Sequence, residues 1–128
     1  MAKDVYIYLK YQTGQLQFCN TESGQYQPVE PDTVTAKPWK NDKVIWQCSQ
    51  DSGIAAITQI GEATKAGNKN IFSQVPSKDN DTCWSGKIKN NVQKGEQEKY
   101  DIVFTDSNGV THTIDPVVDP SPDDDKID

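Results

Sequence analysis

Residues 100–114 read YDIVFTDSNGVTHTI, and this stretch decides the fold that we expect for the chain. Apolar and polar residues alternate in its first half, at Tyr100, Ile102 and Phe104, which is typical of a β-strand with one buried face. The DSNG run that follows is a strong signal for a tight hairpin turn. The run VTHTI then supplies the returning strand, so the stretch predicts an antiparallel hairpin.

The turn of this hairpin predicts how its two strands pair. We expect a three-residue loop over residues 107–109, with the glycine at its end in the left-handed conformation. This loop sets Phe104 opposite His112 and Ile102 opposite Ile114, so that the apolar side chains of both strands share one face.

Short runs of the same kind recur towards the N-terminus, separated by Gly, Pro, Asn, Asp and Ser. The segment from Gly53 to Ile60 fits either a short helix or a strand, and its context favours a strand. Residues 62–70 are the best place for a loop or a single helical turn, and we expect residues 77–82 to be a polar loop. The other expected strands are Val5–Lys10, Gln15–Cys19, Thr33–Ala36, Lys43–Cys48 and Trp84–Ile88.

About eight or nine short strands with frequent turn signals are typical of a β-sandwich. We therefore predict a single all-β, Greek-key β-sandwich domain of the immunoglobulin-like or cupredoxin-like kind over residues 1–118, whose irregular middle segment holds at most one short helix. Residues 119–128 are predicted to be an acidic tail rich in Pro and Asp. This tail is expected to be a solvated end that improves solubility.

Composition excludes several classes of function. The chain of 128 residues carries a net charge of −6, and all 13 of its basic residues are Lys. The last ten residues hold five Asp and one Lys, a charge of −4, which leaves −2 for the rest. Nucleic-acid binding and attachment to anionic membranes are therefore not expected, because both need basic surfaces and base recognition uses Arg extensively.

The three cysteines, Cys19, Cys48 and Cys83, form no CxxC pair, so zinc-ribbon and thioredoxin-like sites have no support. No signal peptide precedes the first strand, which predicts a cytoplasmic protein with reduced thiols. If Met1 replaces a removed signal peptide, the protein is secreted or periplasmic, and a Cys48–Cys83 bridge across two sheets becomes an option. Otherwise these two candidate thiols act as small buried apolar groups or as a regulatory thiol.

Three motifs resemble those of a known family when they are taken in order. Residues 42–46 (DKVIW) resemble the "G-D-x-V-x-W" segment of cupredoxin-like domains, and residues 95–102 resemble the entry to their final hairpin. Residues 114–118 (IDPVV) resemble the ending of small bacterial cupredoxin-like proteins of unassigned function. The resemblance covers roughly residues 34–118 and implies a β-sandwich.

The chain departs from this family where copper would bind. A blue-copper site needs two His and one Cys thiolate, usually with an axial Met. This chain has one His, His112, and its single Met is Met1. Residues 105–109 (TDSNG) stand where the ligand loop is expected and contain no Cys, His or Met. The resemblance therefore implies a sandwich without the copper ligands.

The three tryptophans suggest a surface that binds a ligand. Trp39 and its neighbour Lys40 lie among polar residues and are the best candidates for exposure, whereas Trp46 lies in an apolar strand. Trp84 belongs either to the core or to the opposite face. Exposed Trp and Tyr rings would stack on sugars. The 11 Gln and 8 Asn would supply hydrogen bonds to a sugar or a partner, although a plain solvated face is the favoured explanation.

We predict a non-enzymatic domain with no catalytic residue, no cofactor and no metal. His112 lies between two threonines, which favours a cross-strand packing role over that of a catalytic base. The favoured function is a protein-interaction or assembly module, with a protein partner or self-association. The alternatives are a small carbohydrate-binding module centred on Trp39, and a redox or metal-binding domain that uses Cys48 or Cys83.

Overall fold

The computed structural model describes residues 4–21, 24–30, 33–49, 52–62, 71–92, 98–114 and 116–118. These residues form strands and no helix, so the chain is all-β as predicted. Among them, no helix is long and apolar enough to cross a membrane. The expected helical turn falls mostly on residues 63–70, which lie outside the described residues.

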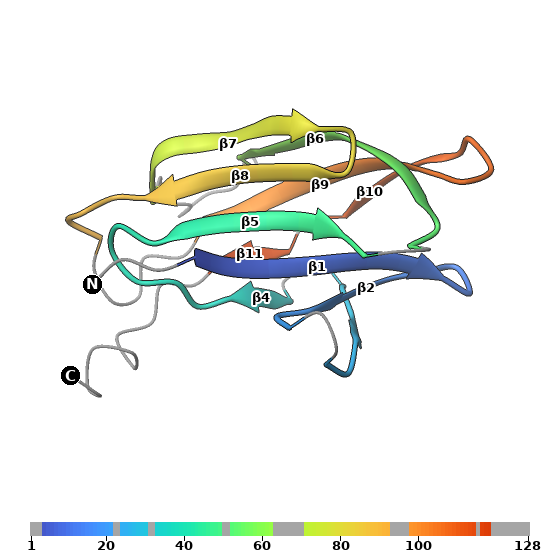
Figure 1. The fold of residues 1–128 in the computed structure, drawn as a ribbon, viewed down its shortest axis with the longest axis horizontal. Coiled ribbons are helices and arrows are strands. Elements are labelled where there is room, and N and C mark those ends of the chain that lie inside the picture. The colour runs from blue at the N-terminus through green and yellow to red at the C-terminus, as the bar shows by residue number, and fades with distance from the viewer. Residues whose placement is uncertain are drawn as a thin grey trace.

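Six strands form the larger sheet, in the order β3-β2-β1-β5-β8-β7 (Figure 1). The inner strands β1 and β5 pair in parallel, and the other neighbours pair in antiparallel fashion. In chain order the six strands are β1 (Asp4–Gln12), β2 (Gln15–Cys19), β3 (Gln27–Pro28), β5 (Lys43–Cys48), β7 (Phe72–Asn80) and β8 (Cys83–Ile88).

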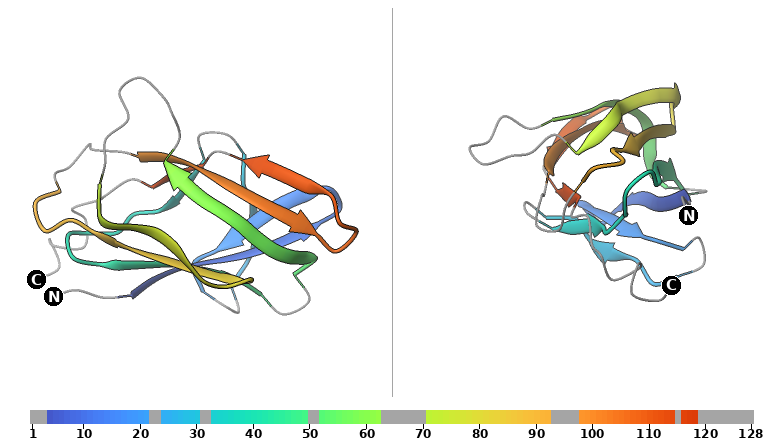
Figure 2. Two further views of the ribbon diagram at one scale, coloured as in Figure 1. Left: turned by 90° about the horizontal axis from the view of Figure 1, so that it is seen from above. Right: turned by 90° about the vertical axis from the view of Figure 1, so that its left-hand side faces the viewer.

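The second sheet has five strands arranged around β9 (Glu98–Asp106). Strand β9 pairs with β6 (Ile54–Glu62), with β10 (Thr111–Ile114) and with β11 (Val117–Val118). Strand β4 (Val34–Ala36) pairs in parallel with β11. The two sheets form the layers of a β-sandwich, with β6, β9 and β10 running obliquely across the strands of the larger sheet (Figure 2).

The core lies between the layers, and side chains along the strands alternate between the core and the outer face. Ile7 and Leu9 of β1 are fully buried, whereas Tyr6 and Tyr8 point to the other face, where their rings stack 5.3 Å apart. The predicted apolar face of β9 is buried in the same core, which removes its large side chains from water and stabilises the sandwich.

Three side chains join the two sheets at the centre of this core. The indole Nε1 of Trp46, on β5, donates a hydrogen bond to the Tyr100 hydroxyl at 3.1 Å. The same hydroxyl lies 2.6 Å from Oγ1 of Thr35, on β4. Burial raises the pKa of Tyr100 to about 12, which keeps the hydroxyl protonated. The polar atoms that these large side chains carry into the core are therefore paired with one another.

The predicted hairpin is confirmed in its pairing and in its turn. Phe104 lies opposite His112 and Ile102 opposite Ile114. Gly109 has φ of 85°, and its N–H donates to the Asp106 carbonyl at 3.0 Å. The turn is therefore the three-residue loop that places both apolar sets on one face.

The middle of the chain corrects one prediction and confirms another. The segment from Gly53 to Ile60 contributes strand β6, as its context predicts. The polar loop expected over residues 77–82 is wrong for its first four residues, because β7 continues to Asn80. Strand β7 lies at the edge of its sheet, so most of its side chains are exposed and carry no apolar alternation. Pro76 and the bulges opposite β8 are compatible with an edge position.

Candidate functional site

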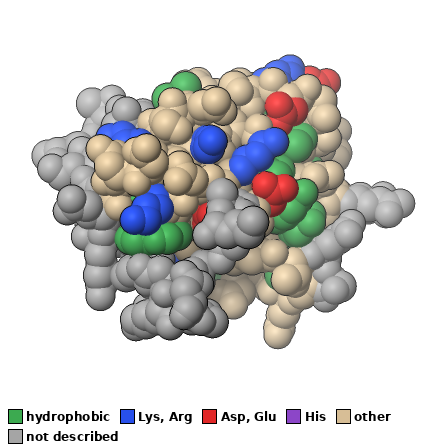
Figure 3. All heavy atoms as spheres, turned by 60° about the vertical axis from the view of Figure 1, so that its left-hand side comes forward, with side chains coloured by type: hydrophobic (Ala, Val, Ile, Leu, Met, Phe, Trp, Pro, Cys, Tyr) green, Lys and Arg blue, Asp and Glu red, His purple; other side chains and the backbone are tan. Residues whose placement is uncertain are grey.

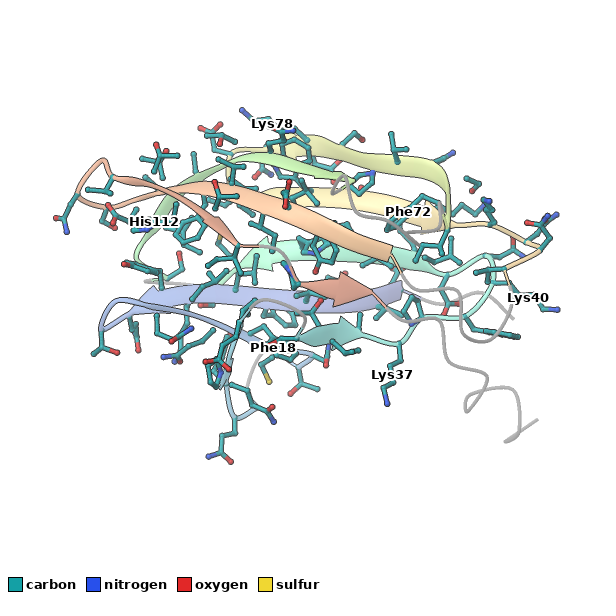
Figure 4. The ribbon with its side chains drawn as sticks, turned by 180° about the vertical axis from the view of Figure 1, so that it is seen from behind. Phe18, Lys37, Lys40, Phe72, Lys78 and His112 are labelled. Atoms are coloured by element: carbon teal, nitrogen blue, oxygen red, sulfur yellow. The ribbon has the colours of Figure 1, made fainter. Side chains whose placement is uncertain are left out.

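A cleft of about 530 Å³ opens at the side of the sandwich, where neither sheet has a long edge strand. One wall comes from Phe18 and Cys19 at the end of β2, and the other from the three residues of β4. Strand β3 has only two residues, so the larger sheet ends early beside the cleft. Figure 4 shows Phe18 and Lys37, which line the cleft from β2 and from the segment after β4, on the same side of the sandwich.

The side chain of Asn20 fixes the spacing between the two walls. Its Nδ2 donates to the Tyr6 carbonyl at 2.8 Å and to the Thr35 carbonyl at 3.1 Å. Because Tyr6 belongs to β1 and Thr35 to β4, one amide bridges the two sheets. Asn20 and Thr35 both line the cleft, so this bridge forms part of its wall.

The lining combines apolar and hydrogen-bonding groups. Phe18 and Ala36 are buried apolar residues, whereas Gln25, Gln27 and Lys37 are exposed at the rim. The side-chain amides of Gln25 and Gln27 make no hydrogen bond to another described residue. The cleft therefore offers an apolar surface with polar groups around it, which is the usual composition of a binding site.

Sequence reasoning did not predict this cleft. Cys19 is not among the candidate thiols predicted from the sequence, yet its Sγ lines the cleft 3.7 Å from Oγ1 of Thr21. Glutamine is abundant in the sequence, and no local pattern distinguishes Gln27 from the others. The local signal that could have indicated an irregular edge here is the pair of prolines at positions 28 and 31 of the sequence.

The predicted binding residues Trp39 and Lys40 lie next to each other at the corner between β4 and β5. The Trp39 indole is partly buried and packs against the core. Nζ of Lys40 lies 5.6 Å from the centroid of the indole ring. Contacts with the core and with Lys40 leave Trp39 less of an open face for a sugar than the sequence suggested.

Trp84 is not part of a surface site, because its side chain lies in the core. It is 9% exposed, and its Nε1 donates to the Ile57 carbonyl at 3.0 Å. Strand β8 directs Trp84, Gly86 and Ile88 inwards, so the indole joins β8 to β6 across the sandwich. Of the two readings that the sequence left open for Trp84, the structure selects the core.

The two candidate thiols, Cys48 and Cys83, are free cysteines on adjacent strands of one sheet, so the bridge across two sheets does not match this fold. Cys83 pairs with Gln47 of β5, one residue before Cys48. Burial raises the pKa of Cys48 to about 12. Burial, followed by the charge of Asp79, also raises the pKa of Cys83. Both thiols are therefore protonated at neutral pH and weakly nucleophilic.

His112 has a structural role at the hairpin that the sequence analysis predicted. Its ring stacks on Phe104, with centroids 5.0 Å apart, and lies 4.7 Å from the ring of Tyr11. Its Nε2 donates to Oδ2 of Asp106 at 2.8 Å. Figure 4 shows His112 near the hairpin end of the sandwich, away from Lys40.

Asp106 holds the hairpin turn in place. Its Oδ1 accepts hydrogen bonds from the backbone N–H groups of Asn108 at 2.9 Å and Val110 at 3.0 Å. The hydrogen bond from His112, and then the one from Val110, lower the pKa of the Asp106 carboxyl below 3.8. The acid and the imidazole thus form a polar link between the turn and β10.

Acid is expected to destabilise the folded protein partly through Asp106. Because its pKa is lower in the folded than in the unfolded state, Asp106 stabilises the fold above about pH 4 and loses this contribution as the pH falls. We expect the melting temperature of the wild type to fall more steeply than that of Asp106→Asn between about pH 5 and about pH 2. Calorimetry measures both slopes. Asp4→Asn, at an exposed strand position, is the matched control, and parallel curves for wild type and Asp106→Asn would contradict the prediction.

In the parts of the chain that the structure describes, no three His, Cys, Asp or Glu side chains gather into a set that could hold a metal ion. Comparison with models of protein families and with curated protein sequences finds no match. The cleft and the surfaces around it are therefore the features from which a function is proposed.

Proposed function

We propose that this chain is a non-enzymatic interaction module that binds an extended segment of a partner protein in the cleft between β2 and β4. The observation that carries the proposal is the cleft itself, about 530 Å³ in volume with mixed apolar and polar walls. Its volume lies in the range of sites that bury a small ligand or a few side chains. The resemblance to cupredoxin-like proteins contributes one thing to this proposal, namely a β-sandwich that holds such a cleft.

A peptide suits this cleft better than a sugar. Phe18 is 8% exposed, and Trp39 is partly buried with Lys40 Nζ 5.6 Å from its ring centroid, so each ring offers a sugar less than a full flat face. By contrast, a peptide side chain would bury apolar surface against Val34, which is only partly buried and lies beside Phe18 and Ala36 in the cleft. Its backbone would hydrogen-bond to the amides of Gln25 and Gln27 at the rim.

Filling the cleft with a large side chain tests this function. Peptides are selected from a random displayed library on the immobilised full chain, synthesised, and titrated by calorimetry. The substitution Gln27→Trp places an indole at the rim, and we expect it to raise the Kd of the selected peptides at least about tenfold. The matched control is Gln59→Trp, because Gln59 is an exposed strand glutamine on the other sheet, and we expect its Kd to stay within about twofold.

Two results would contradict the peptide proposal. One is an equal loss of affinity in both variants, since that indicates a general effect of an added indole. The other comes from oligosaccharides titrated against the same proteins: an oligosaccharide whose binding is abolished by Gln27→Trp alone would assign the cleft to carbohydrate. Circular dichroism of each variant shows whether the sandwich is retained.

A further inference from the structure

Four lysines gather at the corner where β4 leads into β5 and where β8 ends. This lysine corner consists of Lys40, Lys43, Lys87 and Lys89. Lys43 lies directly opposite Lys87 on the neighbouring strand. Lys89 is joined to the turn beside Lys40, because the N–H of Asn41 donates to the Lys89 carbonyl at 3.3 Å.

The positive charge of the corner is only partly balanced. Asp4 of β1 lies beside Lys43 in the register of the sheet, and the nearby Asp42 is buried, with Oδ2 accepting from the Trp39 N–H at 2.7 Å. None of the four ammonium groups forms an ion pair with another described residue. Like charges directly opposite on adjacent strands repel each other, so the Lys43–Lys87 pair favours the approach of an anion.

Figure 3 shows lysine side chains, with some acidic side chains among them, spread over this end of the molecule. Lys37 lies between β4 and the lysine corner in the chain. Figure 4 shows Lys37 and Lys40 projecting outwards at the same end of the sandwich. The body of the protein carries a charge of −2, so this concentration of lysines is a local exception. Such a surface attracts acidic segments over about one Debye length, or about 10 Å at 0.1 M salt.

An acidic segment of this chain starts beside the lysine corner. The last described strand, β11, ends at Val118, which pairs with Ala36 of β4. Lys37 is the next residue after Ala36, and Lys40 follows three residues later. The ten residues that follow Val118 hold five Asp and, fully extended, reach about 33 Å.

We infer that the lysine corner is the docking surface for the Asp-rich C-terminal segment, residues 119–128, of the same chain. The attachment at Val118 gives this segment a high effective concentration at the corner, of the order of mM for a short linker. Each exposed lysine–aspartate contact is weak, but several aspartates facing four lysines act together. This inference is independent of the proposed function, because docking at the lysine corner does not require a peptide to bind in the cleft.

Carbodiimide cross-linking of the full chain, read by mass spectrometry, tests the inference. The reagent joins a lysine to a carboxylate that touches it. We expect cross-links from residues 119–128 to Lys43, Lys87 and Lys89, and their yield to fall at least about fivefold between about 0.02 M and about 0.5 M NaCl. Lys78 of β7, which forms an ion pair with Asp81 at 2.7 Å, is the internal reference. Its cross-links to residues 119–128 measure how often the tethered segment meets a lysine by chance.

The outcomes separate docking from mere tethering. The inference would be overturned if the cross-link yield did not depend on salt concentration. It would also be overturned if Lys78 were cross-linked as often as the lysine corner, because a tether alone explains both results. A mixture of chains with natural and heavy nitrogen shows whether each link lies within one chain. Links between the two kinds of chain would also overturn it and assign the segment to a second copy.

A second measurement uses the full chain with Asp123→Asn, Asp124→Asn and Asp125→Asn combined. We expect the NMR amide signals of residues 40–43 and 87–89 to shift, while those of residues 77–80 stay in place. The substitutions remove negative charge and leave the described sandwich unchanged in sequence. Unchanged signals at the corner would overturn the inference even if cross-links form.

Discussion

Replacing Trp46 with alanine is expected to lower the free energy of unfolding by about 3–5 kcal/mol. Trp46 is completely buried, and its indole meets Tyr100 edge-on with ring centroids 5.4 Å apart. Alanine would leave a cavity between the sheets and would remove the N–H that donates to the Tyr100 hydroxyl. Urea unfolding followed by circular dichroism measures the change, since it does not depend on tryptophan fluorescence.

Trp39→Ala is the matched control for this experiment. The Trp39 side chain packs against the same core but is only partly buried. Its loss is therefore expected to cost about 1–2 kcal/mol, clearly less than the loss of Trp46. Equal costs for the two substitutions would show that Trp46 is not the central contact between the sheets.

Replacing Gly53 with alanine is expected to destabilise the fold by about 3 kcal/mol or more. Gly53 has φ of 78°, a conformation that an L-residue adopts only with strain. A Cβ at this position would overlap the backbone carbonyl oxygen of Tyr11, which belongs to β1 of the larger sheet and cannot swing aside like a side chain. The Gly53 carbonyl also accepts a hydrogen bond from the Ser107 N–H at 3.0 Å, so a shift would disturb the hairpin turn.

Gly109→Ala separates backbone strain from steric overlap. Gly109 has a similar φ of 85°, but a Cβ there would meet no other atom within 4 Å. We therefore expect a cost of about 1–2 kcal/mol from strain alone. Thermal and urea unfolding of both variants measure the difference, and a cost for Gly53→Ala no greater than that for Gly109→Ala would contradict the close approach to Tyr11.

The hairpin over residues 100–114 shows what local sequence is able to predict. A turn of suitable residues fixes the loop, and the alternation of apolar residues fixes the face, so Phe104 and His112 pair as expected. Both signals act between residues that are close in the chain. The same reasoning predicted strands over Val5–Lys10 and Lys43–Cys48, where the structure has β1 and β5.

The full length of the edge strand β7 was not predicted by this reasoning. Residues 77–80 look like a loop because they are polar, yet they form ladder pairs with β8 at the edge of the sheet. A strand that buries little on either face needs no apolar alternation. Its backbone hydrogen bonds do not depend on the type of side chain, so the sequence shows no pattern from which they can be predicted. The structure therefore has longer strands here than the sequence suggested.

By itself, the sequence determined the all-β class, the hairpin register and the separation of an acidic C-terminal segment from a nearly balanced body. Only the tertiary structure decided that Trp84 is buried against β6, that Cys48 and Cys83 lie on neighbouring strands, and that β2 and β4 enclose a cleft. The physical reason is the range of the interactions. Turns and alternation act between near neighbours in the chain, whereas a cleft and a buried indole depend on which distant strands the packing of the core brings together.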